Sequence, residues 1–93
     1  MKISWRPRAA DDFEALIAES SAGHVANASR DKSLVETRTQ QLIRFDQLGR
    51  KTRRQGVREL HIEGTPYVVV SRRLGEEILI LRMFSNGSAV QSR

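Results

Sequence analysis

The sequence predicts an α+β fold, in which a helical hairpin packs on one face of a small, mostly antiparallel sheet. Three observations predict it: alternating apolar and polar residues at 2–6, apolar residues at helical spacing over 7–48, and three strand-like segments after Gly49. The expected element order is β-α-α-β-β-β. At 93 residues the chain suffices for one domain, 1–93, with 85–93 expected as a flexible tail.

The first strand and the first helix are predicted from residue pattern. Residues 2–6 alternate as a short, half-buried strand does. Pro7 suits the first turn of a helix, where its missing N–H costs nothing, and Asp11 and Asp12 suit the positive end of the helix dipole. Small residues at 20–23 indicate where this helix ends.

A second helix is expected before Gly49, and its start has two possible positions. It begins either near Val25 or at Ser33, because Ser33 and Glu36 have the spacing of a capping box. Apolar residues recur at helical spacing over 42–48. The helix is therefore expected to continue to Gly49.

Three strands are expected after the helices, at residues 57–62, 67–73 and 77–84. Turn-forming residues at 63–66 and 75–76 separate them. Because the connections are short, the three strands are expected to pair as an antiparallel meander.

Regular hairpins would divide the side chains of this meander between two faces, since directly opposed residues project to the same side. One face would carry Arg58, Leu60, Ile62, Tyr67, Val69, Ser71, Ile80, Arg82 and Phe84, and the other Val57, Val68, Val70, Leu79, Leu81 and Met83. The second face is the more purely apolar at its centre, so it is predicted to pack on the helices. A slip of one residue in either hairpin would move Arg58 or Arg82 to the opposite face.

The charge of the chain points to an acidic partner. Sixteen Lys+Arg residues against eleven Asp+Glu give a formal net charge of +5, and all but Lys2, Lys32 and Lys51 of these cations are arginines. The planar fork of arginine suits phosphate and carboxylate. Nucleic acid or an acidic protein segment is therefore the expected partner class.

Composition also excludes several classes of protein. With no cysteine there is no disulfide framework and no cysteine-based zinc site, and two histidines alone cannot build a His-rich metal centre. Neither a metal nor a cofactor is expected. The longest apolar run, residues 78–81, is too short to cross a bilayer, and the N-terminus has no apolar stretch of signal-peptide length, so a cytoplasmic location is expected.

Five segments, taken in order, resemble the RelE/ParE toxin superfamily of bacterial type II toxin–antitoxin modules. They are residues 3–13, 49–50, 56–60, 64–70 and 78–82. The sequence of residues 64–82 is closer to that of the ParE branch. The resemblance implies a toxin that inhibits DNA gyrase and is neutralised by a cognate antitoxin from an adjacent gene, in a hetero-oligomer.

The resemblance leaves two other functions open. RelE-like members cut messenger RNA on the ribosome, and this chain would do so with Arg58 and Arg82. However, no Tyr, His or Lys follows Tyr67, so the last strand and tail offer no obvious general acid or base. Residues 85–89 also depart from the His-Gly-Ala of many relatives, and Ser71 stands at a common tyrosine position. A toxin-fold binding module with lost target activity is the third reading.

The resemblance and the charge pattern together give candidate target-binding residues. Arg58 and Arg82 match arginines that RelE-like members place around the scissile phosphate, and they would be the catalytic residues of a nuclease. Arg50, Arg53 and Arg54 form a cationic stretch that would extend the contact. The alternative is that these side chains bond to neighbouring acids or only solvate the surface.

The resemblance implies that an antitoxin segment covers the face predicted to carry Arg58 and Arg82. The candidate contacts are Trp5, Phe13, Leu60 and Tyr67. For Trp5 and Phe13 a place in the core is the alternative. His61 is expected on the surface of a strand and His24 at a helix boundary, neither acting as a base.

Overall fold

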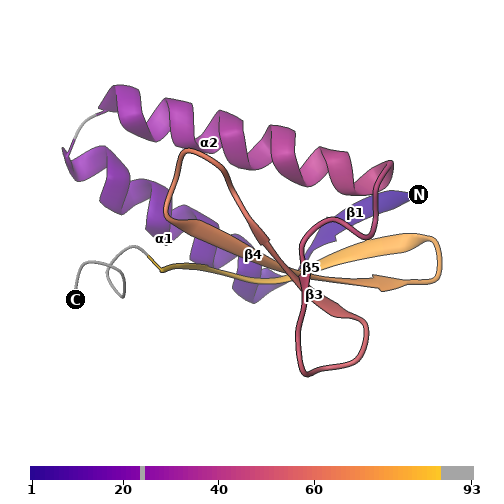
Figure 1. Ribbon diagram of the computed structural model, residues 1–93. Coiled ribbons are helices and arrows are strands. Elements are labelled where there is room, and N and C mark those ends of the chain that lie inside the picture. The colour runs from indigo at the N-terminus through magenta and orange to yellow at the C-terminus, as the bar shows by residue number, and fades with distance from the viewer. Residues whose placement is uncertain (24, 87–93) are drawn as a thin grey trace.

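Two helices, connected as a hairpin, lie along one side of a five-stranded sheet (Figure 1). The computed structural model describes residues 1–23 and 25–86, so the expectations for His24 and for residues 87–93 lie outside the described residues. The elements are β1 (Lys2–Trp5), α1 (Pro7–Gly23), α2 (Val25–Gln40), the 3₁₀ helix η1 (Gln41–Ile43), β2 (Arg50–Lys51), β3 (Val57–His61), β4 (Tyr67–Leu74) and β5 (Glu77–Ser85). The predicted α+β class is confirmed. In the part of the chain that is described, no helix is long and apolar enough to cross a membrane.

The strand order is β1-β5-β4-β3-β2. β1 runs parallel to β5, with Lys2 opposite Glu77, and the other pairs are antiparallel. The hydroxyl of Ser4 donates a hydrogen bond to the carboxylate of Glu77 across the parallel pair. The short edge strand β2 was not predicted, because two charged residues carry no alternating pattern.

Both helices begin where a pattern predicted a start, but α2 ends early. α2 starts at Val25, so the capping box proposed at Ser33 is wrong and lies inside the helix. The predicted continuation to Gly49 is also wrong. The chain tightens into η1, and Leu42 is fully buried while Phe45 is 60% exposed. A regular α-helix would have placed these two residues on one face, so the apolar spacing over 42–48 comes from a turn.

The helices cover the face opposite to the one predicted. The core cluster contains Ala9, Val35, Leu42, Leu60, Ile62, Tyr67, Val69, Ile78, Ile80 and Met83. Most of its strand residues come from the face that was predicted to lie away from the helices because Arg58 and Arg82 were placed there. The error has a physical cause in the pairing of β4 with β5.

A β-bulge in β5 changes the register halfway along the last hairpin. Ser71 lies opposite Ile80, as a regular hairpin requires, but Val70 lies opposite Arg82, so Leu81 is an extra residue. From this point on, every side chain of β5 changes face. Met83 therefore enters the core, and Arg82 and Phe84 move to the face that has no helices.

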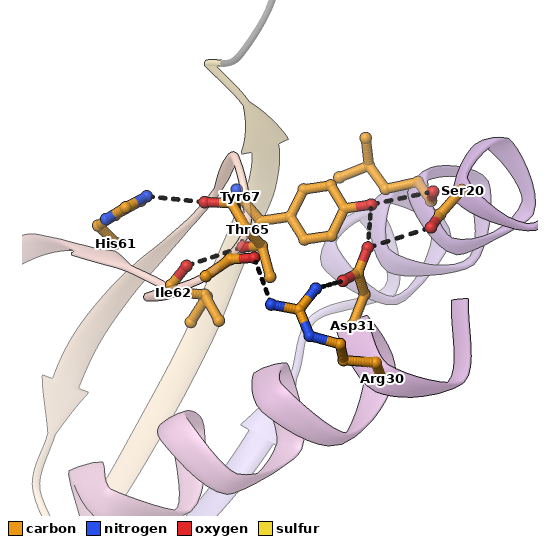
Figure 2. A network of polar contacts seen from close by, with 9 residues as sticks. Ser20, Arg30, Asp31, His61, Ile62, Thr65 and Tyr67 are labelled. Atoms are coloured by element: carbon orange, nitrogen blue, oxygen red, sulfur yellow. Dashed lines mark hydrogen bonds and ion pairs between the residues drawn. The ribbon is translucent and has the colours of Figure 1, made fainter. Parts of the chain in front are cut away.

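A buried polar network ties the helices to the turn between β3 and β4 (Figure 2). The Tyr67 hydroxyl donates to Asp31 Oδ2 at 3.3 Å, and Ser20 donates to the same oxygen at 3.1 Å. Arg30 bonds to the carbonyl oxygen of Gly64 at 3.2 Å and lies 3.5 Å from the Asp31 carboxylate. Burial, followed by the charge of Asp31, raises the pKa of Tyr67. Each buried polar group of the network thus has a partner, which holds α1 and α2 in register with the sheet.

Two glycines give a matched test of how tightly the sheet is packed. Gly49 has φ +95°, and a Cβ there would lie 2.7 Å from the carbonyl oxygen of Glu59, whereas Gly75 has φ +61° and open space around it. We expect Gly75→Ala to lose about 1 kcal/mol of unfolding free energy through its backbone conformation alone. Gly49→Ala should lose roughly 1–3 kcal/mol more because the β3 backbone has to move. Urea denaturation measures both, and equal losses would contradict this packing.

Candidate functional site

The face of the sheet without helices, here called the open face, carries both charged and apolar side chains. Its residues on β3, β4 and β5 are Val57, Glu59, His61, Val68, Val70, Arg72, Leu74, Glu77, Leu79, Arg82 and Phe84. A cavity of about 470 Å³ lies against it, here called the arginine hollow, lined by Thr52, Arg53, Arg54, Val57, Glu59, Val70, Arg82, Met83 and Phe84. Phe84 is 40% exposed, so the hollow offers an aromatic surface beside three arginines.

The loop between β2 and β3 presents Arg53 and Arg54 to this hollow. Thr52 Oγ1 accepts a hydrogen bond from the backbone N–H of Arg54 at 3.1 Å and donates to the carbonyl of Val57 at 3.1 Å. Gly56, at φ +79°, lets the chain turn back into β3. The loop is therefore closed by its own hydrogen bonds, which hold the two arginines at its tip.

Three exposed arginines at this end of the open face have no partner for their guanidinium groups within residues 1–23 and 25–86. They are Arg53, Arg54 and Arg72. Arg72 lies over the loop, since a Cβ on Gly56 would be 3.9 Å from its Nε. In contrast, Arg50 forms an ion pair with Glu59 at 3.0 Å. The unpaired charges make this end of the sheet a region of positive potential that attracts an anionic ligand.

Arg82 is held from the side by Asp12 of α1. Its Nε and Nη2 donate to Asp12 Oδ2 at 2.7 Å and Oδ1 at 3.1 Å, and the backbone N–H of Met83 donates to Oδ2 at 3.0 Å. The hydrogen bond from Arg82 is the main cause that lowers the pKa of Asp12, against the opposing effect of burial. The same contact raises the pKa of Arg82. This arginine is therefore ordered, whereas those of the loop are free.

The structure separates the two arginines that the sequence argument paired. Arg58 lies opposite Ser71 on the helix-covered face, and Arg82 lies opposite Val70 on the open face. Arg58 is half-buried and donates from Nη1 to the carbonyl of Gly49 at 3.1 Å. The prediction that both share one face is wrong, because the bulge in β5 moved Arg82. Arg53, Arg54 and Arg82 are brought together instead.

The predicted antitoxin contacts also divide into two groups. Leu60 and Tyr67 are 2% and 5% exposed and belong to the core, so their prediction as surface contacts is wrong. Trp5 and Phe13 are half-buried, and their rings stack with centroids 5.1 Å apart. These two rings line a second cavity of about 400 Å³ between the helices, together with Ala10, Glu14, Ile17, Lys32 and Glu36. We call it the helical groove.

Sequence reasoning missed two residues of the site, Asp12 and Arg72. Asp12 was assigned to the helix dipole, which gave no signal of its contact with Arg82 from the far end of the chain. Arg72 was not a candidate, and it lies beside the loop because it is paired with Val57 across β3 and β4.

The arginine hollow can bind and orient anions, but it offers little for acid–base chemistry. Its charged side chains are the three arginines and Glu59. His61 points to the turn instead, with its ring nitrogen 2.9 Å from the carbonyl oxygen of Thr65. Among the described residues, no group of three His, Asp or Glu side chains could hold a metal ion. Guanidinium groups in this arrangement supply electrostatic recognition of phosphate or carboxylate.

Comparisons with known proteins agree with this fold. A family model described as the ParE toxin of the type II toxin–antitoxin system parDE matches residues 3–88. The chain is similar to a chromosomal ParDE toxin–antitoxin system from P. aeruginosa, with 26% identity, coverage of 91% of this chain and 95% of that one, and a TM-score of 0.79. It has the fold of a chain in the E. coli DinJ–YafQ complex, with 12% identity, coverage of 92% and 93%, and a TM-score of 0.62. Curated protein sequences gave no match.

Replacing Asp12 with Asn is expected to destabilise the protein in a pH-dependent way. Because the folded-state pKa of Asp12 lies below its ordinary value of 3.8, the ionised carboxylate adds stability that is complete above about pH 5. This stability is lost as the pH falls through the lowered pKa. Urea midpoints measured between about pH 2 and pH 7 should therefore differ most at neutral pH and converge in acid. A difference that stays constant over this range would contradict the role given to the carboxylate.

Proposed function

Because the chain belongs to the ParE toxin family of type II toxin–antitoxin systems, we propose that it inhibits DNA gyrase and is neutralised by a cognate antitoxin in the cytoplasm. The observation that carries the proposal is the arginine hollow, which gathers unpaired cations beside an exposed aromatic ring. Such a surface suits a target that presents phosphate or carboxylate groups. Arg53, Arg54 and Arg82 are the proposed target contacts, whereas Arg50 lies on the edge strand β2 and Arg58 on the helix-covered face of β3.

A ribosome-dependent mRNA endonuclease is the second candidate function. The likeness to YafQ supports only a shared fold, since the identity is 12%. Arginines could stabilise the charge on a scissile phosphate. However, the lining of the hollow contains no His, Tyr or Lys to transfer a proton, and its one carboxylate, Glu59, is ion-paired with Arg50. A toxin-fold module without target activity is the third candidate function. Expression experiments distinguish the three candidates.

The helical groove is the proposed seat of an antitoxin segment. The structure similar at 26% identity is that of a ParDE system, in which a toxin and an antitoxin occur together. The groove has an apolar floor of Trp5, Phe13 and Ile17, and Lys32 and two glutamates at its rim. An amphipathic segment could place apolar side chains on this floor and match the mixed charges at its rim. Because the groove and the arginine hollow involve different elements, the antitoxin segment and the target would contact different surfaces.

Induced expression in bacteria tests the target. We expect a DNA-damage response with filamentation, and inhibition of supercoiling by purified DNA gyrase. Arg53→Ala combined with Arg54→Ala should weaken inhibition about tenfold, since two cations leave the contact. Arg44→Ala is the control, because it removes an exposed cation from the loop after η1.

Other outcomes of the expression experiment would identify the alternatives. Rapid translation arrest with cleaved transcripts would replace gyrase by the ribosome as target. Absence of any growth effect, together with unimpaired supercoiling, would favour the inactive module. An equal loss of inhibition in Arg44→Ala would remove the hollow from the target contact.

Co-purification with the product of the adjacent gene tests the antitoxin seat. Ala10→Glu places a carboxylate in the groove, where an apolar segment would bury it without a partner, so we expect the complex to dissociate during purification. Ala15→Glu is the matched control, because Ala15 is exposed on the same helix and does not line the groove. Retention of the complex by both variants would exclude the groove.

A further inference from the structure

We propose that Asp12 is the positioning residue that orients Arg82 in the arginine hollow to bind an oxyanion, phosphate or carboxylate, of the target. The inference rests on the proposed function of the open face as the target-binding surface. It extends that function to α1, which contributes no residue to the lining of the hollow. Four observations carry it: the anchoring of Asp12, the N–H groups that remain on Arg82, the place of Arg82 in the hollow, and the charge of the loop beside it.

Asp12 is anchored to the sheet independently of Arg82. β1 ends opposite Ile80, so the edge of β5 beyond that residue has no strand beside it. There the backbone N–H of Met83 donates to Asp12 Oδ2 at 3.0 Å. The side chain of Asp12 is only 18% exposed, whereas that of Arg82 is 47% exposed. The carboxylate is therefore a fixed point on which the longer and more exposed arginine is held.

The contact with Asp12 leaves most donors of Arg82 available. A guanidinium has five N–H groups, and Asp12 accepts from Nε and from one hydrogen of Nη2. Both hydrogens of Nη1 and the second hydrogen of Nη2 remain. Together they form a fork that can grip a second carboxylate or a phosphate by two parallel hydrogen bonds. Arg82 thus binds Asp12 through Nε and one N–H of Nη2, and the N–H groups at the end of its guanidinium are left for a ligand.

The ligand site for this fork is the arginine hollow. Arg82 lines it together with Arg53 and Arg54, whose guanidinium groups have no partner in the described part of the chain. An oxyanion on the fork of Arg82 would lie in the field of the two loop arginines. The two loop arginines attract the oxyanion, and Arg82 orients it because Asp12 holds the guanidinium in place.

Asp12 has two opposing effects on anion binding, and an affinity measurement shows which of them is larger. Its negative charge repels an anion, whereas its hydrogen bonds order Arg82 before the ligand arrives. Three N–H donors already share this carboxylate, which reduces its field in the hollow. Ordering a long side chain in advance spares the cost of immobilising it on binding, which amounts to about a tenfold gain in affinity. We therefore expect loss of Asp12 to weaken anion binding, although it makes the protein more positive.

Titration with inorganic pyrophosphate, followed by the Nε–Hε NMR signals of the arginines, tests this sign. In the wild type the Arg82 signal should shift with pyrophosphate. Asp12→Asn should lower the affinity about tenfold and broaden the Arg82 signal in the free protein. The matched control is Asp46→Asn, which makes the same charge change at the ion pair with Arg73, outside the hollow. This control should keep or slightly raise the affinity.

A double-mutant cycle separates positioning from a general loss of structure. In the Arg82→Ala background, Asp12→Asn should no longer weaken pyrophosphate binding and should keep or slightly raise the affinity, because only the charge of Asp12 is then left to act. Asp12→Glu keeps the charge and displaces the carboxylate by one methylene, so it should still bind more weakly than the wild type. It also replaces Asp12→Asn in the cycle, should that variant not fold.

Several results would overturn the proposal. Unchanged or tighter binding by Asp12→Asn would show that the charge of Asp12 outweighs its positioning. A loss that persists in the Arg82→Ala background would show a structural role, and an Arg82 signal unaffected by pyrophosphate in the wild type would remove the oxyanion site. Failure to inhibit gyrase, with the pyrophosphate results as expected, would discard the proposed target and keep the role of Asp12.

Discussion

Two helices can cover only one face of this sheet, and the division of the side chains follows from that limit. On the covered face Leu60, Val69 and Ile80 are at most 2% exposed. Alternation along each strand then sends the neighbours of these residues to the opposite side, which has no helices over it. Charged residues such as Glu59 and Arg72 lie there beside apolar ones such as Val68, which is 6% exposed. The surface proposed for the target and the core are thus formed by opposite faces of the same strands.

A single extra residue decides which arginine belongs to which face. The elements could be predicted from the sequence because apolar spacing, turn residues and strand alternation are local signals. The bulge at Leu81 has no such signal, because the apolar run through residues 78–81 continues across it. Regular pairing therefore placed Arg82 with Arg58 and assigned the helices to the wrong face. A one-residue change of register suffices for this, since side chains alternate with a period of two.

Apart from Arg82, which came from the family resemblance, the residues of the site could be predicted from the sequence only where they are close in the chain. Arg53 and Arg54 were predicted because a run of cations before a turn is visible locally, and both line the hollow. The contact of Asp12 with Arg82 joins the first helix to the last strand. No spacing rule reports such a contact, and the helix dipole gave Asp12 a sufficient local explanation. Long-range contacts depend on topology, which a single sequence describes least well.

The parallel pairing of β1 with β5 also determines when the protein can complete its fold. Lys2 through Trp5 find their partners only in Glu77 through Ile80, so the first strand has no place in the sheet until the last one has been synthesised. Contacts between such distant segments form slowly, because a long loop has to close first. The same last strand brings Arg82 and Phe84 to the hollow. A growing chain on the ribosome therefore lacks the surface proposed for the target until Arg82 and Phe84 have been synthesised.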